Sequence, residues 1–280
     1  MYLVGGNNTS YFYFLERQVY KRMIKGEISI KIHQLISFSS IFAELLPGEN
    51  IFSPGCAILS MGEEIVMKTY ELLKTQIPDL KLSTMCCGKP SLHIDGGRPY
   101  KRRKQFLNAA FKSNGTKKIY TLCPNCQHTL SDNSDCEIIS AWTVLDKAIP
   151  REKYNIYNGR KLSLHDPCPI VDYLENTVAA RNILNKLGVD ILEFANNREK
   201  TLCCGKKNMI MTLDPQKGQK LFQIRAKQAP SKEIITYCAS CVDTFRQNDF
   251  EAYHILELLW EMKTNGSWRN RYNSVRKIKR

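Results

Sequence analysis

The sequence contains no run of 18 or more consecutive apolar residues, the minimum length for a membrane-spanning helix. Its first residues also lack the basic-then-apolar order of a secretory signal peptide. We therefore expect a cytoplasmic protein that is peripheral to a membrane at most. In a reducing compartment the eleven cysteines are not expected to form disulfides. Metal ligation or redox chemistry is then the default interpretation of these cysteines.

Acidic residues are scarce relative to basic ones. The chain has 27 Asp and Glu against 41 Lys and Arg, a formal net charge of +14 that assumes neutral thiols. Metal-bound thiolates would make the protein less basic. The excess lies mainly in residues 101–104 and 269–280, which form either a solvated face and a frayed tail or a patch for an anionic partner. Nucleic acid is not expected as that partner, because stacking and groove-reading patterns are missing.

Ten of the eleven cysteines form one pattern that occurs twice. Each half contains a single cysteine, then Cys-Cys-Gly, then Cys-x-x-Cys. The first set is Cys56, Cys86, Cys87, Cys123 and Cys126, and the second is Cys168, Cys203, Cys204, Cys238 and Cys241. The remaining Cys136 is interpreted as a buried apolar residue. Internal duplication of this kind predicts two similar lobes related by a pseudo-twofold axis.

Each half also repeats the order strand, cysteine-bearing turn, helix, strand. Strands are expected at 50–52, 80–84 and 118–122 and again at 161–165, 189–194 and 233–237. Helices are expected at 63–73 and 99–112 and again at 176–187 and 216–227. The predicted fold is α/β, with two pseudo-symmetric lobes that each contain a small parallel sheet flanked by helices. Such units place ligand-binding turns at the carboxyl ends of their strands.

Four segments are expected along the chain. They are a helical N-terminal extension over 1–50, a first cysteine-rich domain over 51–150, a second over 151–262, and a basic C-terminal tail over 263–280. The extension has apolar residues at helical spacing over 12–23 and 30–46, and its lone His33 is interpreted as structural. The domain boundary is placed in the polar connection at 150–159.

The spacing of the cysteines predicts that the five sulfurs of each half meet. Cys56 and Cys86 are 30 positions apart and Cys168 and Cys203 are 35 apart, room for one strand-helix excursion back to the same sheet edge. The glycine after each cysteine pair permits a left-handed backbone, which would let both sulfurs face one object. Five thiols exceed the four ligands of structural zinc or of a cubane cluster. An unusual cluster, a spare thiol, zinc and free redox thiols all stay open at this point.

With a proline beside the first cysteine of each half, the doubled pattern resembles the tandem cysteine-rich (Cys-Cys-Gly) domains found in the B-type subunits of heterodisulfide reductases. The resemblance covers residues 51 to about 260. Related domains occur in iron-sulfur subunits of glycolate and lactate oxidation and in some succinate and thiol:fumarate reductases. The resemblance implies that the ten patterned cysteines ligate two non-cubane [4Fe-4S] clusters, one per half. It also implies that the clusters face each other across the lobe interface and cleave a disulfide of two small anionic thiols.

The implied activity is that of an iron-sulfur oxidoreductase of the disulfide reductase type, active within a complex. Catalysis would occur at the cluster ligands, with Cys87 and Cys204 favoured. The chain lacks the Cys-x-x-Cys-x-x-Cys-x-x-x-Cys-Pro segment of several relatives, so a ferredoxin-like iron-sulfur subunit and a flavoprotein are expected to donate electrons. One alternative is a non-catalytic electron-relay or metal-binding subunit of a flavin-dependent glycolate or lactate oxidoreductase. Another is a zinc-binding scaffold, with zinc in one or both sites.

Residues next to the ligands are candidates for supporting roles. His165 and Asp166 could act in acid-base catalysis, but a hydrogen bond to a cluster sulfur or a role in fixing the turn is preferred. Gly88 and Gly205 are expected to shape the turns that carry the cysteine pairs. Three lysines beside these turns would either attract an anionic substrate or be solvated surface residues: Lys89, Lys206 and Lys207.

Overall fold

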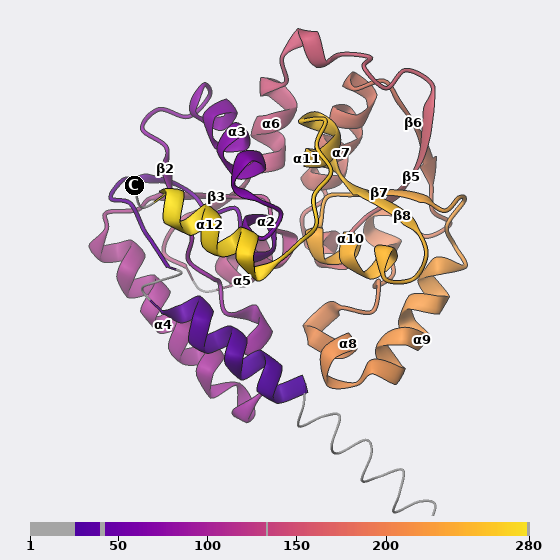
Figure 1. Ribbon diagram of the computed structural model, residues 1–280. Helices are drawn as coiled ribbons and strands as arrows, with labels where there is room; N and C mark the ends of the chain where they lie inside the picture. Colours follow the sequence, from indigo (N-terminus) through magenta and orange to yellow (C-terminus); the bar gives the residue numbers. More distant parts are fainter. Residues whose placement is uncertain (1–25, 40–42, 133, 279–280) are drawn as a thin grey trace, which may run out of the picture.

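The computed structural model describes residues 26–39, 43–132 and 134–278, and the predicted helix at 12–23 lies outside these ranges. The described chain forms two lobes that lie side by side, each built on a four-stranded sheet (Figure 1). All strand pairs within the two sheets are parallel. The predicted α/β class, the two lobes and the helical N-terminal region are therefore confirmed.

The first lobe has the strand order β2-β1-β3-β4. Its strands are β1 (Asn50–Phe52), β2 (Lys81–Leu82), β3 (Lys118–Thr121) and β4 (Glu137–Ser140). Its helices are α2 (Cys56–Leu59), α3 (Glu63–Lys74), α4 (Arg98–Ser113), α5 (Pro124–Ser131) and α6 (Ala141–Ala148). Helix α3 carries acidic residues in its first turn and a lysine in its last, which complements the helix dipole.

The second lobe has the order β6-β5-β7-β8, which matches the first lobe strand for strand. Its strands are β5 (Arg160–His165), β6 (Val189–Glu193), β7 (Glu233–Thr236) and β8 (Glu251–His254). Its helices are α7 (Glu175–Lys186), α8 (Ile210–Leu213), α9 (Pro215–Ala226), α10 (Ala239–Arg246) and α11 (Ile255–Leu259). Short 3-10 turns occur at Lys89–Ser91, Asp95–Gly97, Arg151–Lys153, Cys168–Asp172, Arg198–Lys200 and Lys207–Met209.

The matching topology puts the cysteines of each lobe at one edge of its sheet. The single cysteine follows the central strand β1 or β5, and the cysteine pair follows the neighbouring strand β2 or β6. The Cys-x-x-Cys pair follows β3 or β7, on the other side of the central strand, and leads into α5 or α10. Because the strands are parallel, all these turns lie at the carboxyl edge, where α/β folds bind their ligands.

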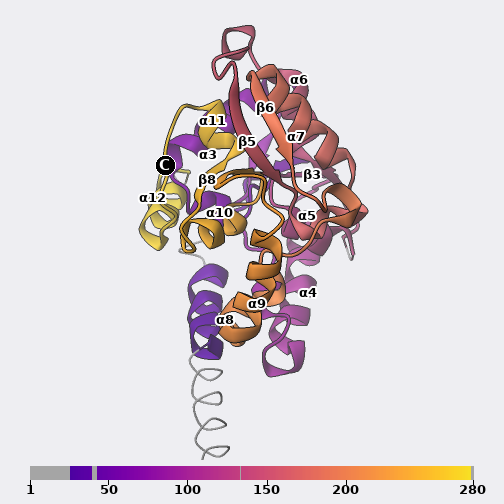
Figure 2. The ribbon, with the colours of Figure 1, turned by 90° about the vertical axis from the view of Figure 1, so that its right-hand side faces the viewer.

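The N-terminal helix ends earlier than the sequence suggests. Residues 26–38 are helical, whereas the apolar spacing predicts a helix over 30–46. Figure 2 shows this indigo helix at the same end of the molecule as α4, α8 and α9. Within the described part of the remainder, Leu45 forms an isolated antiparallel bridge with Ser83, and the Leu46 N–H donates to the Leu82 carbonyl at 3.3 Å. Pairing with the end of β2 therefore satisfies backbone groups that the helix would have used.

The segment interpreted as a basic C-terminal tail contains a packed helix, α12 (Trp268–Ile278). In Figure 1 this yellow helix lies across the first lobe, beside α2. Val275 is 1% exposed, and the Ser274 hydroxyl donates to the Leu59 carbonyl at 3.0 Å. The basic residues Arg276 and Lys277 face outward. The helix is thus amphipathic: its apolar face packs on the first lobe, and most of its basic residues lie on the opposite face.

The two lobes share one apolar core, and tryptophan side chains of each lobe contact residues of the other. The Trp142 ring meets Tyr237 of the second lobe edge-on, with ring centroids 5.9 Å apart. The Trp260 indole N–H donates to the Thr69 hydroxyl of the first lobe at 2.9 Å. One cluster of buried residues accordingly draws members from both lobes. Among the helices within the described ranges, none has the length and apolar character needed to cross a bilayer.

Candidate metal centre

The five thiols of each lobe lie against one another in the same order. In the first lobe the pKa values of Cys56, Cys86, Cys87 and Cys126 are shifted by their neighbours in the series Cys56, Cys86, Cys87, Cys126, Cys123. In the second lobe the equivalent series is Cys168, Cys203, Cys204, Cys241, Cys238. The sulfurs of Cys204 and Cys241 are 3.2 Å apart, and all ten residues are free cysteines. The structure thus brings the ten thiols together as two groups of five, which we call the first and second thiol quintets.

Left-handed glycines shape the two turns that carry the cysteine pairs. Gly88 has φ 83° and Gly205 has φ 90°. The N–H of Gly88 donates to the Cys86 sulfur at 3.4 Å, and the N–H of Gly205 donates to the Cys203 sulfur at 3.2 Å. A side chain at Gly205 would place its Cβ 2.4 Å from the Gly218 carbonyl oxygen. At Gly88 a Cβ would lie 2.8 Å from Cγ of the buried Arg103. Each turn therefore needs glycine for its backbone angle and for space.

Both thiol quintets open onto one cavity of about 110 Å³ between the lobes. Eight of the ten cysteines line it: Cys56, Cys87, Cys123, Cys126, Cys168, Cys204, Cys238 and Cys241. Lys89, Lys206 and Lys207 also line this cavity, so all three lysines singled out from the sequence lie at the site. A larger cavity of about 670 Å³ shares Cys56, Pro90 and Met209 with the first. We call these two spaces the thiol cavity and the outer cavity.

Proton affinities differ sharply within each thiol quintet. The pKa of Cys203 falls to about 2 because the thiols of Cys168 and Cys204 donate to its sulfur, helped by the N–H of Lys207 at 3.4 Å. The pKa of Cys204 rises to about 12, mainly because of Cys203. In the first lobe the pKa of Cys86 is likewise lowered, with Cys56 as the largest cause. The pKa of Cys238 is lowered as well, with the hydrogen bond to Cys241 as the largest cause. Negative charge is therefore favoured on Cys86 in the first quintet and on Cys203 and Cys238 in the second, and a bound metal would displace protons from other thiols.

His165 presents a hydrogen-bond donor to the second quintet. Its Nδ1 accepts from the Arg225 Nε at 2.9 Å, which leaves the proton of the neutral ring on Nε2. That Nε2 is buried and has no hydrogen-bond partner among the described residues. His165, Cys204 and Cys241 offer ligand atoms within 4.8 Å of one another. Burial, followed by the charge of Arg225, lowers the pKa of His165 to about 3, so the ring is neutral at physiological pH.

Arg225 is a buried cation beside the second quintet. It is fully buried, donates to the Asn196 carbonyl at 2.6 Å, and lies 4.1 Å from the centre of the Phe194 ring. Within the described ranges no carboxylate is in ion-pair contact with it, and burial lowers its pKa to about 10. The Asp166 carboxylate is the largest source of compensating charge, and the thiols of Cys241 and Cys204 would add negative charge on losing their protons to a bound metal. A buried cation in this position favours an anionic occupant of the quintet.

Asp166 fixes the loop before the second cysteine pair through hydrogen bonds to residues outside the quintet. Its carboxylate is fully buried and accepts from Arg181 Nη2, from the Tyr237 hydroxyl and from the Arg198 N–H, each at 2.8 Å. Its carbonyl accepts from the Thr201 hydroxyl at 2.6 Å. These bonds hold the pKa of Asp166 below its usual value despite burial. The residue therefore positions the chain that delivers Cys203 instead of contacting the site itself.

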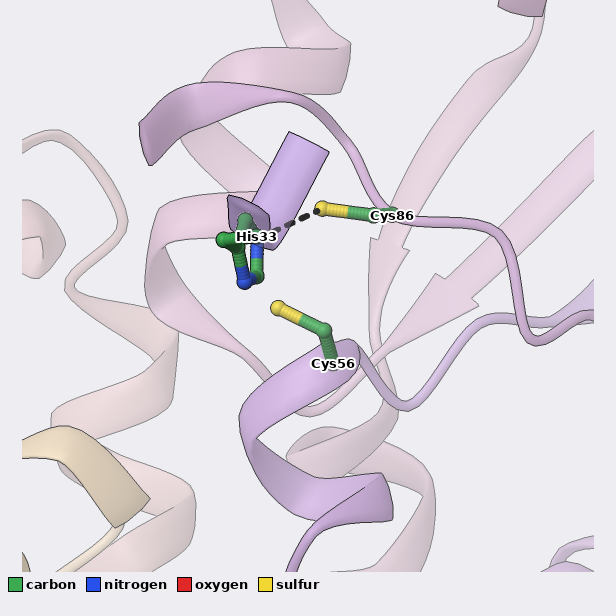
Figure 3. Close-up of side chains that lie close together, drawn as sticks. All are labelled: His33, Cys56 and Cys86. Atoms are coloured by element: carbon green, nitrogen blue, oxygen red, sulfur yellow. Dashed lines mark hydrogen bonds between the residues drawn. The ribbon is translucent and has the colours of Figure 1, made fainter. Parts of the chain in front are cut away.

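His33 lies at the first quintet, a position that no sequence motif predicts. It lies on the N-terminal helix, with Nε2 3.8 Å from the Cys86 sulfur (Figure 3). Its ligand atom and the sulfurs of Cys56 and Cys86 all lie within 4.8 Å of one another. The sequence alone indicates a structural role because His33 is 53 positions from Cys86, with no motif around it. By contrast, Cys136 lies apart from both quintets and donates to the Thr116 carbonyl at 3.2 Å.

Two repeated α/β lobes that turn their cysteines toward one shared cavity define a tandem cysteine-rich protein. A family profile described as "CCG: Cysteine-rich domain" matches residues 51–131 and 162–246. The chain belongs to this family and contains two copies of its domain in tandem. The resemblance to the tandem Cys-Cys-Gly proteins of the heterodisulfide reductase type is thereby confirmed.

Two curated relatives show more distant similarity. One is "Probable iron-sulfur-binding oxidoreductase FadF" of Bacillus subtilis (strain 168), 24% identical over 169 residues, which are 53% of this chain and 24% of that protein. The other is "EtfAB:quinone oxidoreductase" of Syntrophomonas wolfei subsp. wolfei, 21% identical over 201 residues, 63% of this chain and 28% of that protein. The chain thus spans about a quarter of the length of these relatives.

A solved structure, Picrophilus torridus aspartate racemase, also aligns with the chain. The alignment covers 80% of this chain and 98% of that one, with 7% identity and a TM-score of 0.31. A TM-score this low supports no conclusion about fold or function.

Proposed function

We propose that the chain is an iron-sulfur oxidoreductase subunit in which each thiol quintet holds a non-cubane [4Fe-4S] cluster. In this proposal the ten patterned cysteines are the metal ligands, and a disulfide or related acceptor is reduced in the thiol cavity. The observation that carries the proposal is that both quintets open onto this one cavity. The similarity to relatives named as iron-sulfur-binding and quinone oxidoreductases supports the same chemical class.

The residues at the quintets suit an anionic, sulfur-rich group better than zinc. A tetrahedral zinc site would use four of the five thiols and leave one over. The buried Nε2–H of His165 needs an acceptor, which a cluster sulfide or a ligating thiolate supplies. The buried charge of Arg225 would likewise be balanced by an anionic cluster. The donor set and its surroundings therefore fit the proposed cofactor.

The chain's own groups would bind and orient the acceptor. Iron-sulfur clusters supply electrons one at a time, and two of them on one cavity match the two electrons that a disulfide requires. Lys89, Lys206 and Lys207 place positive charge around the cavity, which favours a small anionic disulfide. Lys206 also forms an ion pair with Asp243 at 3.6 Å, so Lys207 and Lys89 are the more available cations. The outer cavity has the volume to hold the parts of a substrate that the thiol cavity cannot.

The test of the metal assignment is anaerobic purification followed by iron and zinc quantitation and EPR. Cys87→Ser and Cys204→Ser should lower bound iron and abolish turnover of an anionic disulfide, with dithionite-reduced viologen as the electron source. Cys136→Ser is the matched control, because Cys136 lies outside both quintets, and it should keep both properties. Full turnover in either quintet variant after loss of iron would refute the proposal, as would zinc in place of iron in the wild-type protein.

A second candidate is an electron-relay subunit that passes electrons between partner proteins. It is favoured by the relative named EtfAB:quinone oxidoreductase, of which the matched region is 28%. In this function the chain would take electrons from a flavoprotein or a ferredoxin-like iron-sulfur subunit, and the disulfide chemistry would be absent. The two candidates separate when the purified chain is reduced and mixed with disulfides. Cluster reoxidation by a disulfide supports the reductase, and reoxidation by a quinone alone supports the relay.

A further inference from the structure

We infer that His33 is a nitrogen ligand of the metal group at the first thiol quintet, so that the two centres are chemically unequal. The inference rests on the proposed function, because it concerns the metal that the first quintet would hold. Its basis is the position of His33 among the sulfurs of Cys56 and Cys86, which Figure 3 shows converging from three separate segments.

The distances are those of donors that share one metal. A nitrogen and a sulfur bound to one tetrahedral metal at about 2.1 and 2.3 Å lie about 3.6 Å apart. His33 Nε2 and the Cys86 sulfur are 3.8 Å apart. Cys86 and Cys56 are neighbours at one end of the first quintet, so a group bound by the quintet would meet the imidazole there.

The helix that carries His33 is anchored at the first lobe by two buried arginines. Arg271 of α12 donates to the Ser37 hydroxyl at 2.6 Å, and that hydroxyl lies 3.4 Å from the His33 ring nitrogens. Arg103 of α4 stacks 4.5 Å from the Phe38 ring centre and donates to the Cys86 carbonyl at 3.0 Å. The helix bearing the imidazole and the turn bearing the thiol are thus tied to the same side chain, which fixes their relative position.

The second lobe has a different arrangement. Its histidine, His165, comes from the strand β5 and lies against Cys204 and Cys241, in the middle of the second quintet. Cys203, the counterpart of Cys86, accepts from the N–H groups of Gly205 and Lys207. In the part of the chain that the structure describes, no histidine forms a ligand group with Cys168 and Cys203. The imidazole therefore breaks the symmetry of the duplicated domains.

Unequal ligands imply unequal reduction potentials. His33 would take one metal position in place of a thiolate of the first quintet, so that one of the five thiols would not be a ligand there. Replacement of thiolate by neutral imidazole raises the potential of an iron-sulfur centre, because it removes negative charge from the oxidised state. We therefore expect the first centre to be reduced at a higher potential than the second. Electrons that enter the protein one at a time would collect at the first centre before the second is reduced.

The experiment uses full-length, anaerobically purified protein labelled with ¹⁵N-histidine. The first readout is pulsed EPR of the reduced protein, which detects nitrogen coupled to iron, and the second is a redox titration followed by EPR. His33→Gln and His33→Cys are the test variants, and His93→Gln is the matched control, since His93 is exposed on the same lobe. Circular dichroism and iron content report whether each variant is folded and loaded.

The expected result is a histidine nitrogen coupling that both His33 variants lose and the His93 variant keeps. His33→Cys should also lower the potential of one centre and leave the other unchanged. If the wild-type protein contains iron but this coupling is missing, or survives in His33→Cys, the inference is wrong and the proposed function stands. If the wild-type protein contains no iron, the proposed function fails and the inference fails with it.

Discussion

Gly205 offers a quantitative test of how tightly the second cysteine turn is built. Its φ of 90° lies in the region that favours glycine, and a Cβ there would stand 2.4 Å from the Gly218 backbone oxygen. For Gly205→Ala, the left-handed conformation costs about 1–2 kcal/mol. Relief of the clash requires movement of a helix backbone, which adds about 1–3 kcal/mol. We therefore expect the free energy of unfolding to fall by about 2–5 kcal/mol.

Gly159→Ala separates the two contributions. Gly159 lies in the same lobe with φ 78°, and a Cβ there would meet nothing within 4 Å. Only the backbone cost of about 1–2 kcal/mol applies to it. The measurement is urea unfolding of the reduced, metal-free proteins, followed by circular dichroism. Equal losses in the two variants would show that the approach of the Gly218 carbonyl does not constrain the turn, and the reasoning would be refuted.

Three further predictions concern buried groups. Burial lowers the pKa of His165 to about 3 and that of His254 to about 4, so below about pH 6.5 only the unfolded chain takes up protons at these residues. The free energy of unfolding should therefore fall as the pH drops below about 6.5, by about 1.4 kcal/mol per pH unit for each histidine. Urea unfolding of wild-type protein and His254→Gln at pH 7 and pH 5 checks this, and identical pH dependence in the two would count against it. Asp166→Asn should lower the free energy of unfolding by about 1.5–3 kcal/mol in the same assay, because it removes the buried carboxylate that accepts from Arg181 and leaves Glu193 as the remaining anion of that guanidinium. Glu193 is the second partner of Arg181, and its side chain is 32% exposed, so Glu193→Gln should lower the free energy of unfolding less than Asp166→Asn does. A larger loss for Glu193→Gln would contradict the role given to Asp166 in fixing the loop. Val275→Asp should release α12, because a carboxylate is costly at a site that is 1% exposed. Limited proteolysis within 263–278 would then accelerate, and an unchanged rate would show that the helix does not depend on this contact.

The convergence of the thiols could be predicted from the sequence, because the same cysteine pattern occurs at equivalent positions of two repeated strand-helix units. Each gap between cysteines in the pattern is long enough for one strand-helix excursion, and parallel strands return the chain to the same edge of the sheet. The left-handed angles of Gly88 and Gly205 follow from the demand that two adjacent sulfurs face one point. Local spacing and repetition were sufficient for these features, because the topology that positions them is the simplest parallel one.

Features that depend on contacts between distant segments could not be anticipated. His33 lies near Cys86 because side chains of α4 and α12 hold its helix in place. The sequence around His33 contains no motif that predicts these contacts. The packing of α12 could not be predicted from the sequence, because the two buried residues Val275 and Ser274 are outnumbered by basic residues in this segment. Leu45 leaves the predicted helix because a strand end offers it backbone partners 38 positions away. In each case tertiary contacts outweighed local propensity.

The position of α12 affects how the protein can be divided into separately expressed pieces. The helix follows the second lobe in the chain but covers α2 and α3 of the first, with the Ser267 N–H donating to the Ser60 carbonyl at 3.0 Å. A cut at 150–159 would therefore give an amino-terminal fragment without its covering helix and a carboxyl-terminal fragment with an unpaired apolar stripe. The natural units of this molecule are not contiguous in sequence. Complementation of two co-expressed fragments is a sounder design than isolation of either one.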